Sequence, residues 1–171
     1  MSTLFDEAIR SAASRVIAAA ADAGLRVATV ETVTGGLLAA ALTETPGASK
    51  VFEKGFVLYH SDAKATGLGA DPGLAATHGA VSAPVTAALA EGLREHSGAD
   101  VGVAVTGYAG PTGGNDRDPV GTVYLAGFRR GGTAAGERSV FGGDRLAVRL
   151  AAVQAALTRL AELIDQERVD R

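Results

Sequence analysis

Apolar runs short enough for a strand alternate along this chain with longer segments in which apolar residues recur at helical spacing. The strand-like runs cover residues 25–30, 51–59, 101–105, 120–128 and 139–141, and the helix-like segments cover residues 4–23, 36–43, 62–67, 82–96 and 144–166. Strands that alternate with helices predict an α/β fold with a largely parallel sheet. The last two strands follow each other directly, so they should pair as a hairpin and make the sheet mixed.

Residues at the ends of these segments predict where the helices begin. Thr3 is expected to cap the first helix. Ser82 and Asp144 are expected to cap the two long helices that come later in the chain. The segment around residues 72–73 is polar and contains Pro72 and Gly73, and no helix or strand is predicted there.

Composition excludes several classes of protein and site. The 171 residues carry a formal net charge of −3, which offers neither the basic surface that nucleic acid requires nor a polybasic stretch for a membrane. The chain has no cysteine and its three histidines are scattered, so neither a disulfide nor a metal site is expected. No apolar run could span a bilayer and the first residues are acidic, which favours a cytoplasmic protein. No linker or repeat is visible, so we expect one domain over residues 1–171.

The most distinctive turn lies between the first strand and an apolar helix and reads Glu31-Thr32-Val33-Thr34-Gly35-Gly36. The first amides of a helix have no partner within the helix, and the helix dipole makes that end positive. Such a turn suits a phosphate or another anionic group. A structural role is equally consistent with the sequence, because many α/β proteins place two glycines at a helix start for packing.

Polar residues also follow the other strands, at the edge where parallel strands should end together. Ligands of open α/β sheets bind beyond that edge. The residues concerned are Thr32 and Thr34 after the first strand, Tyr59, His60 and Lys64 after the second, and Thr106 with the glycine-rich loop 107–119 after the third. Each has a structural alternative, as a helix cap, a rim aromatic or a solvated charge, and the charges at residues 116–118 are expected to lie in solvent. Their coincidence at one edge favours a binding site.

The turn at residues 31–36 is the first of an ordered series of motifs. The others are Pro46-Gly47-Ala48-Ser49, Phe52-Glu53-Lys54-Gly55-Phe56-Val57-Leu58-Tyr59-His60-Ser61-Asp62-Ala63-Lys64, His78-Gly79-Ala80-Val81-Ser82, Ala104-Val105-Thr106-Gly107-Tyr108-Ala109-Gly110-Pro111-Thr112-Gly113-Gly114, Pro119-Val120-Gly121-Thr122-Val123-Tyr124 and Phe141-Gly142-Gly143-Asp144-Arg145. The series covers about residues 5–165 and resembles the CinA C-terminal domain family, whose stand-alone members are nicotinamide mononucleotide deamidases (PncC).

The resemblance implies a three-layer α/β/α sandwich with a mostly parallel, mixed sheet, no cofactor, and a homo-oligomer. It also implies a small-molecule nucleotide substrate, nicotinamide mononucleotide, which is hydrolysed at its carboxamide to nicotinate mononucleotide and ammonia. Amide hydrolysis needs a nucleophile, a proton donor for the leaving ammonia and donors for the oxyanion. Our hypothesis is that Ser49 attacks, Lys64 is the base, and Tyr59 relays the proton or stabilises the oxyanion. Lys64 serves as a base only where desolvation or a neighbouring cation populates its neutral amine.

A further group of residues is predicted to bind the substrate, and all of them except Glu31 are expected to contact its phosphate and ribose. Arg145 is a candidate because its planar fork suits phosphate oxygens. The other members of this group are Glu31, Thr34, Gly35, Gly36, Thr106, Gly107, Gly110 and Gly113.

Two departures from the family pattern keep a second function open. Thr32 and Val33 replace a serine and a cysteine, and His60-Ser61 replaces Ser-Asn. The extra methyl group of Thr32 limits its rotamers and crowds the pocket. If the hydroxyl at position 32 is the attacking group, Thr32 belongs to the catalytic set and activity should be reduced. The alternative is a catalytically weak or inactive nucleotide-binding relative, whereas an NTPase is disfavoured because no lysine follows the glycine pair.

Overall fold

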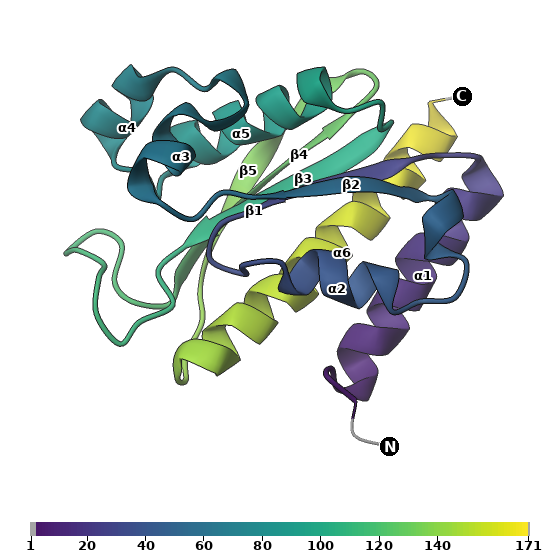
Figure 1. Cartoon of the computed structure of the whole chain (residues 1–171), viewed down its shortest axis with the longest axis horizontal. Coiled ribbons are helices and arrows are strands. Elements are labelled where there is room, and N and C mark those ends of the chain that lie inside the picture. Colours follow the sequence, from purple (N-terminus) through teal and green to yellow (C-terminus); the bar gives the residue numbers. More distant parts are fainter. Residues whose placement is uncertain (1–2, 171) are drawn as a thin grey trace.

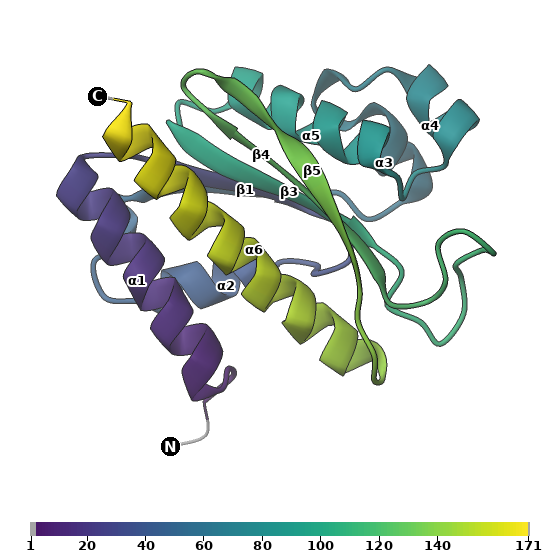
Figure 2. The ribbon, with the colours of Figure 1, turned by 180° about the vertical axis from the view of Figure 1, so that it is seen from behind.

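The computed structural model describes residues 3–170, except the side chains of residues 134 and 135, so both ends of the expected 1–171 domain lie outside the described residues. A five-stranded sheet lies between two layers of helices (Figure 1, and Figure 2 from behind). The strands are β1 (Val27–Glu31), β2 (Phe52–Val57), β3 (Val101–Gly107), β4 (Thr122–Arg129) and β5 (Gly132–Val140). The helices are α1 (Glu7–Ala23), α2 (Leu37–Thr43), α3 (Ser61–Thr66), α4 (Pro72–His78), α5 (Ala83–His96) and α6 (Arg145–Val169), with short 3-10 helices η1 (Ala48–Lys50) and η2 (Gly67–Gly69). In this part of the chain, no helix is both long and apolar enough to cross a membrane.

The sheet has the strand order β2-β1-β3-β4-β5. β1 pairs in parallel with β2 and with β3, whereas β4 runs antiparallel to both β3 and β5. Four strands therefore run in one direction and β4 in the other, which confirms the mostly parallel, mixed sheet. The carboxyl ends of β1, β2 and β3 meet at one edge, as the prediction of a binding site requires.

Each face of the sheet has its own helical layer, with α1, α2 and α6 on one face and α5, α3 and α4 on the other (Figure 1). A hydrophobic core lies on each face of the sheet. In β3, Val101, Val103 and Val105 pack in the core formed with α1, α2 and α6, and Ala104 packs in the core formed with α5. Successive side chains of a strand point to opposite faces, so a strand buried on both faces has a continuous apolar sequence. This two-sided burial explains why β3 is recognisable in the sequence.

The same alternation decides where two polar side chains at the strand ends point. In β1, Glu31 is in phase with Val27, which packs in the core beneath α1, α2 and α6, so the Glu31 carboxylate lies on the α2 side. In β3, Thr106 is in phase with Ala104, so its hydroxyl lies on the α5 side. Both polar side chains are fully buried.

The helix ends agree in part with prediction. Ser82 and Asp144 cap α5 and α6 as expected, since each accepts a hydrogen bond from an amide of the first turn. Asp6 rather than Thr3 caps α1, because its carboxylate accepts from the Ile9 amide at 2.9 Å. The Thr3 hydroxyl instead donates to the backbone carbonyl two residues further along the chain.

Two elements differ from the predicted pattern. The segment at residues 72–73 begins helix α4, since proline suits the first turn of a helix and Asp71 accepts from the Gly73 amide at 2.8 Å. β5 begins at Gly132, seven residues before the predicted strand. Its described side chains are half-buried or exposed, and an edge strand of this kind has no apolar run by which to recognise it.

Candidate functional site

A small cavity opens at the carboxyl edge of the sheet, where the loops after β2 and β3 meet the start of α6. The cavity has a volume of about 130 Å³ and is lined by Val33, Tyr59, Lys64, Gly107, Tyr108, Ala109, Gly110, Thr112 and Arg145. The structure thus brings together five of the predicted site residues, namely Tyr59, Lys64, Gly107, Gly110 and Arg145. The loop between β3 and β4 projects from this edge of the sheet in Figure 1.

Three side chains give the cavity its chemistry. Tyr59 follows β2, Lys64 lies on α3 and Arg145 begins α6. Lys64 Nζ lies 5.1 Å from the centroid of the Tyr59 ring, within cation–π range. Arg145 donates to the Tyr59 hydroxyl oxygen and to the Gly110 carbonyl, both at 2.7 Å. Because the Tyr59 oxygen accepts from Arg145, its own proton is available for a ligand.

Thr32 precedes Val33, which lines the cavity, but the Thr32 side chain is itself fully buried. Its hydroxyl donates to the Val105 carbonyl at 3.1 Å, and the same oxygen accepts from the Thr32 amide at 3.0 Å. A β-branched side chain has few χ1 rotamers, so this hydroxyl reaches the cavity only if that bond breaks. Thr32 is therefore close to the site along the chain, with its oxygen engaged by β3.

The backbone amides at the start of α2 bind a carboxylate of the protein, that of Glu31. The Glu31 carboxylate accepts hydrogen bonds of 3.0, 3.0 and 2.9 Å from the amides of Gly36, Leu38 and Ala39. These are helix-start donors of the kind expected to bind a substrate phosphate. The turn is thus capped internally, and Glu31, Gly35 and Gly36 are not among the residues that line the cavity, so their role as ligands stays a prediction.

Three other predicted ligands also lie outside the cavity lining. The Thr34 side chain is buried, and its hydroxyl has no hydrogen-bond partner among the described residues. The Thr106 hydroxyl lies 2.8 Å from that of Thr86 in α5, whose own proton is donated to the Ser82 carbonyl. Thr106 therefore joins the sheet to α5. Gly113 lies on an exposed part of the β3–β4 loop.

Ser49 is not brought to the cavity within one chain. It is exposed in η1, before β2 begins, whereas Tyr59 and Lys64 follow the end of the same strand. β2 contains six residues, and a strand rises about 3.3 Å per residue, so roughly 20 Å of sheet separate the two ends. The predicted pairing of Ser49 with Lys64 is therefore not supported by the geometry of a single chain.

Asp118 anchors the β3–β4 loop and is buried, contrary to prediction, whereas Asp116 and Arg117 are exposed as predicted. Asp118 is 1% exposed and accepts from the Tyr124 hydroxyl at 2.7 Å and from Arg138 Nε at 2.9 Å. Arg117 adds a longer bond of 3.3 Å. Burial raises the pKa of the Asp118 carboxyl, but the hydrogen bonds from Tyr124 and Arg138 outweigh burial and keep this pKa below its ordinary value. Tyr124 and Arg138 are cross-strand partners, so only the β4–β5 register brings them together at Asp118.

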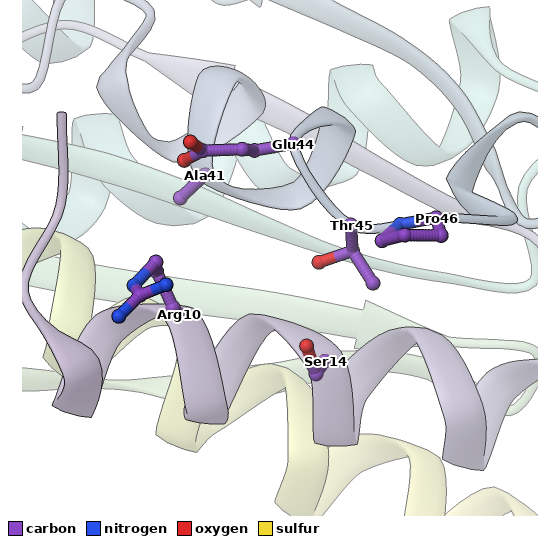
Figure 3. Close-up of a pocket in the computed structure, with 6 residues that line it drawn as sticks. All are labelled: Arg10, Ser14, Ala41, Glu44, Thr45 and Pro46. Carbon is purple, nitrogen blue, oxygen red and sulfur yellow. The ribbon is translucent and has the colours of Figure 1, made fainter. Parts of the chain in front are cut away.

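A second cavity, of about 280 Å³, lies between α1 and the end of α2 (Figure 3). Arg10 and Ser14 line it from α1, and Glu44 lines it from the residue after α2. It contains none of the predicted site residues, and Arg10 already pairs with Glu7 at 2.5 Å. Nowhere in residues 3–170 do three or more histidine, cysteine or acidic side chains form a group that could bind a metal ion. The smaller cavity at the sheet edge is therefore the candidate site.

Curated relatives match most of this chain. A CinA-like protein of Akkermansia muciniphila is 46% identical over 154 residues, which are 90% of this chain and 37% of that protein. A putative competence-damage inducible protein of Symbiobacterium thermophilum is 46% identical over 131 residues, which are 77% of this chain and 30% of that protein. The chain therefore spans about a third of the length of these relatives.

Solved structures share the fold. The competence/damage inducible protein CihA from Agrobacterium tumefaciens has a TM-score of 0.91 at 42% identity, and the match covers 95% of this chain and 99% of that one. A CinA superfamily protein from Escherichia coli has a TM-score of 0.86 at 36% identity, with 95% and 94% of the two chains covered. The model of the CinA C-terminal domain matches residues 9–164. With that match and these structural neighbours, the chain belongs to the CinA C-terminal domain family.

Proposed function

We propose that this protein hydrolyses the carboxamide of nicotinamide mononucleotide, giving nicotinate mononucleotide and ammonia. The observation that supports the proposal best is the arrangement of Tyr59, Lys64 and Arg145 around one cavity. The phenol of Tyr59 can donate a hydrogen bond to an oxyanion. The amine of Lys64 can transfer a proton, and the guanidinium of Arg145 suits a phosphate. The identity of the substrate comes from the family resemblance.

In the proposed reaction, the Thr32 hydroxyl turns from the Val105 carbonyl toward the cavity and attacks the carboxamide carbon. The neutral amine of Lys64 accepts the hydroxyl proton and returns it to the leaving nitrogen, which departs as ammonia. Water then adds to the resulting ester. Lys64 accepts a proton from the water and passes it to the Thr32 oxygen as the ester bond breaks, which releases nicotinate mononucleotide and restores the hydroxyl.

Two further groups complete the proposed mechanism. Tyr59, whose oxygen accepts from Arg145, donates its own proton to the oxyanion of the tetrahedral intermediate. Arg145 and the loop at residues 107–110 bind the phosphate and ribose. Thr32 replaces Ser49 as the attacking group in this scheme, because Ser49 lies beyond the opposite end of β2.

The competing function is that of a nucleotide-binding protein without turnover. The observation that favours it is the Thr32 hydroxyl, which is buried and bonded to the Val105 carbonyl. The two functions share a ligand and differ in whether ammonia is released, so measurements of binding and of product together distinguish them.

The deciding experiment incubates the purified protein with nicotinamide mononucleotide, assays ammonia and measures binding by calorimetry. We expect ammonia from the wild type and from Ser49→Ala, and none from Lys64→Met or Thr32→Val. Binding without ammonia in the wild type would leave only the competing function. Loss of activity in Ser49→Ala with retention in Thr32→Val would return the attacking role to Ser49, supplied by a second copy of the chain.

A further inference from the structure

Arg149 lies on α6 one helical turn after Arg145 and is half-buried. Its Nε donates to the Val33 carbonyl and its Nη2 to the Thr34 carbonyl, both at 3.1 Å. The two arginines connect the start of α6 to the three loops at the carboxyl edge, since Arg149 reaches the loop after β1 and Arg145 reaches those after β2 and β3. Figure 1 shows the first half of α6 beside the connection from β1 to α2.

Gly35 provides the space for the Arg149 guanidinium. Its φ is +58°, a left-handed conformation that glycine adopts without strain. A Cβ atom at this position would lie 3.1 Å from Arg149 Nη2, which is closer than ordinary van der Waals contact. The glycine that the sequence suggested for phosphate binding therefore accommodates a side chain of the protein.

Two side chains of opposite charge stabilise the turn at residues 31–36, one by binding backbone amides and the other by binding backbone carbonyls. The Glu31 carboxylate binds amides at the start of α2, and the Arg149 guanidinium binds the carbonyls of residues 33 and 34. Hydrogen bonds with one charged partner are stronger than neutral ones. Both glycines of the turn have positive φ and would otherwise allow many backbone conformations. Loss of either charge releases the turn on one side.

We propose that Arg149 is a positioning residue for the amidohydrolase reaction, because it fixes the turn that carries Thr32. The proposal rests on the function proposed above. Thr32 directly precedes the two carbonyls that Arg149 binds, so a shift of the turn moves its hydroxyl relative to the cavity. Arg149 does not line the cavity, and it acts through the turn rather than on the substrate.

The test compares Arg149→Met and Arg149→Lys with a matched control, Arg168→Met. Arg168 is also on α6, is exposed, and pairs with Asp165 at 3.8 Å. Arg149→Met should lower kcat for ammonia release about 100-fold with an unchanged KM for nicotinamide mononucleotide, because a misplaced reacting group slows the chemical step. Arg149→Lys can still donate to one carbonyl and should recover part of the loss, whereas Arg168→Met should behave as the wild type.

Amide hydrogen exchange separates this effect from unfolding. The amides of Gly35 and Leu37 bond to carbonyls within the turn, so Arg149→Met should speed their exchange and leave that of Val103 in the sheet unchanged. Unchanged exchange of the two turn amides in Arg149→Met overturns the proposal, whether kcat falls or not. If the wild type itself releases no ammonia, the proposed function fails, and the exchange rates alone decide whether Arg149 fixes the turn.

Discussion

The side chain at position 32 decides how readily a hydroxyl can reach the candidate site. Thr32 Oγ1 lies 3.1 Å from the Val105 carbonyl oxygen, and a neutral hydrogen bond of this kind stabilises the fold by about 1 kcal/mol net. When the hydroxyl turns toward the cavity, this bond is lost and the γ-methyl group is forced into a poorer rotamer of a fully buried side chain, which adds about 1 kcal/mol. Serine has no γ-methyl group, so it loses only the hydrogen bond.

We therefore expect Thr32→Ser to raise kcat about fivefold, since removal of about 1 kcal/mol from the barrier corresponds to that factor. The measurement is steady-state ammonia release from nicotinamide mononucleotide, with Thr32→Val as the control that keeps the shape and lacks the hydroxyl. In both variants the Val105 carbonyl still accepts from the backbone amide of residue 32, at 3.0 Å in the wild type, so it is not left unpaired. A kcat for Thr32→Ser at or below that of the wild type, together with an active Thr32→Val, would refute the assignment.

Three other changes test the base, the turn and the loop anchor. Lys64→Met should abolish ammonia release and leave the calorimetric affinity for nicotinamide mononucleotide within about threefold, because it removes a base more than a binding contact; an unchanged kcat would remove Lys64 from the reaction. Glu31→Gln should lower the free energy of unfolding by about 2 kcal/mol, or Tm by roughly 4–8 °C, because an amide NH2 would face backbone donors; an unchanged Tm in a thermal scan would contradict the internal cap. The pKa of Asp118 is lowered in the fold, so its charge stabilises the protein above about pH 4 and this contribution is lost as the pH falls through the folded pKa. In denaturant titrations the wild type should exceed Asp118→Asn in stability at pH 7, with a difference that shrinks below about pH 4; a constant difference would count against the cluster.

How much of the fold can be predicted depends on how each element is buried. β1 and β3 are covered on both faces, so they appear in the sequence as continuous apolar runs. β5 is an edge strand that pairs with β4, and its described side chains are half-buried or exposed, so its sequence has no apolar run that would predict a strand. Helix α4 has no fully buried residue, so it has no apolar stripe, and only its Asp-Pro start marks it.

The candidate site is harder to predict because closeness along the chain and in space differ. Ser49 precedes Tyr59 by ten residues, yet β2 separates them across the sheet. Asp118 and Arg138 are twenty residues apart, and the β4–β5 hairpin brings them within hydrogen-bond distance. One signal was available for Glu31, since its phase with Val27 places its carboxylate on the core side beneath α2.

Arg145 and Arg149 come late in the polypeptide, whereas the three loops that they hold together all end before residue 122. During synthesis, all five strands leave the ribosome before α6, so the three loops still lack their hydrogen bonds to Arg145 and Arg149 when the strands are complete. The cavity is therefore expected to bind a ligand only after α6 has been synthesised and has packed against the sheet. A nascent or prematurely terminated product would lack both the completed cavity edge and the α6 side chains, such as Leu157 and Leu160, that fill one of the two cores.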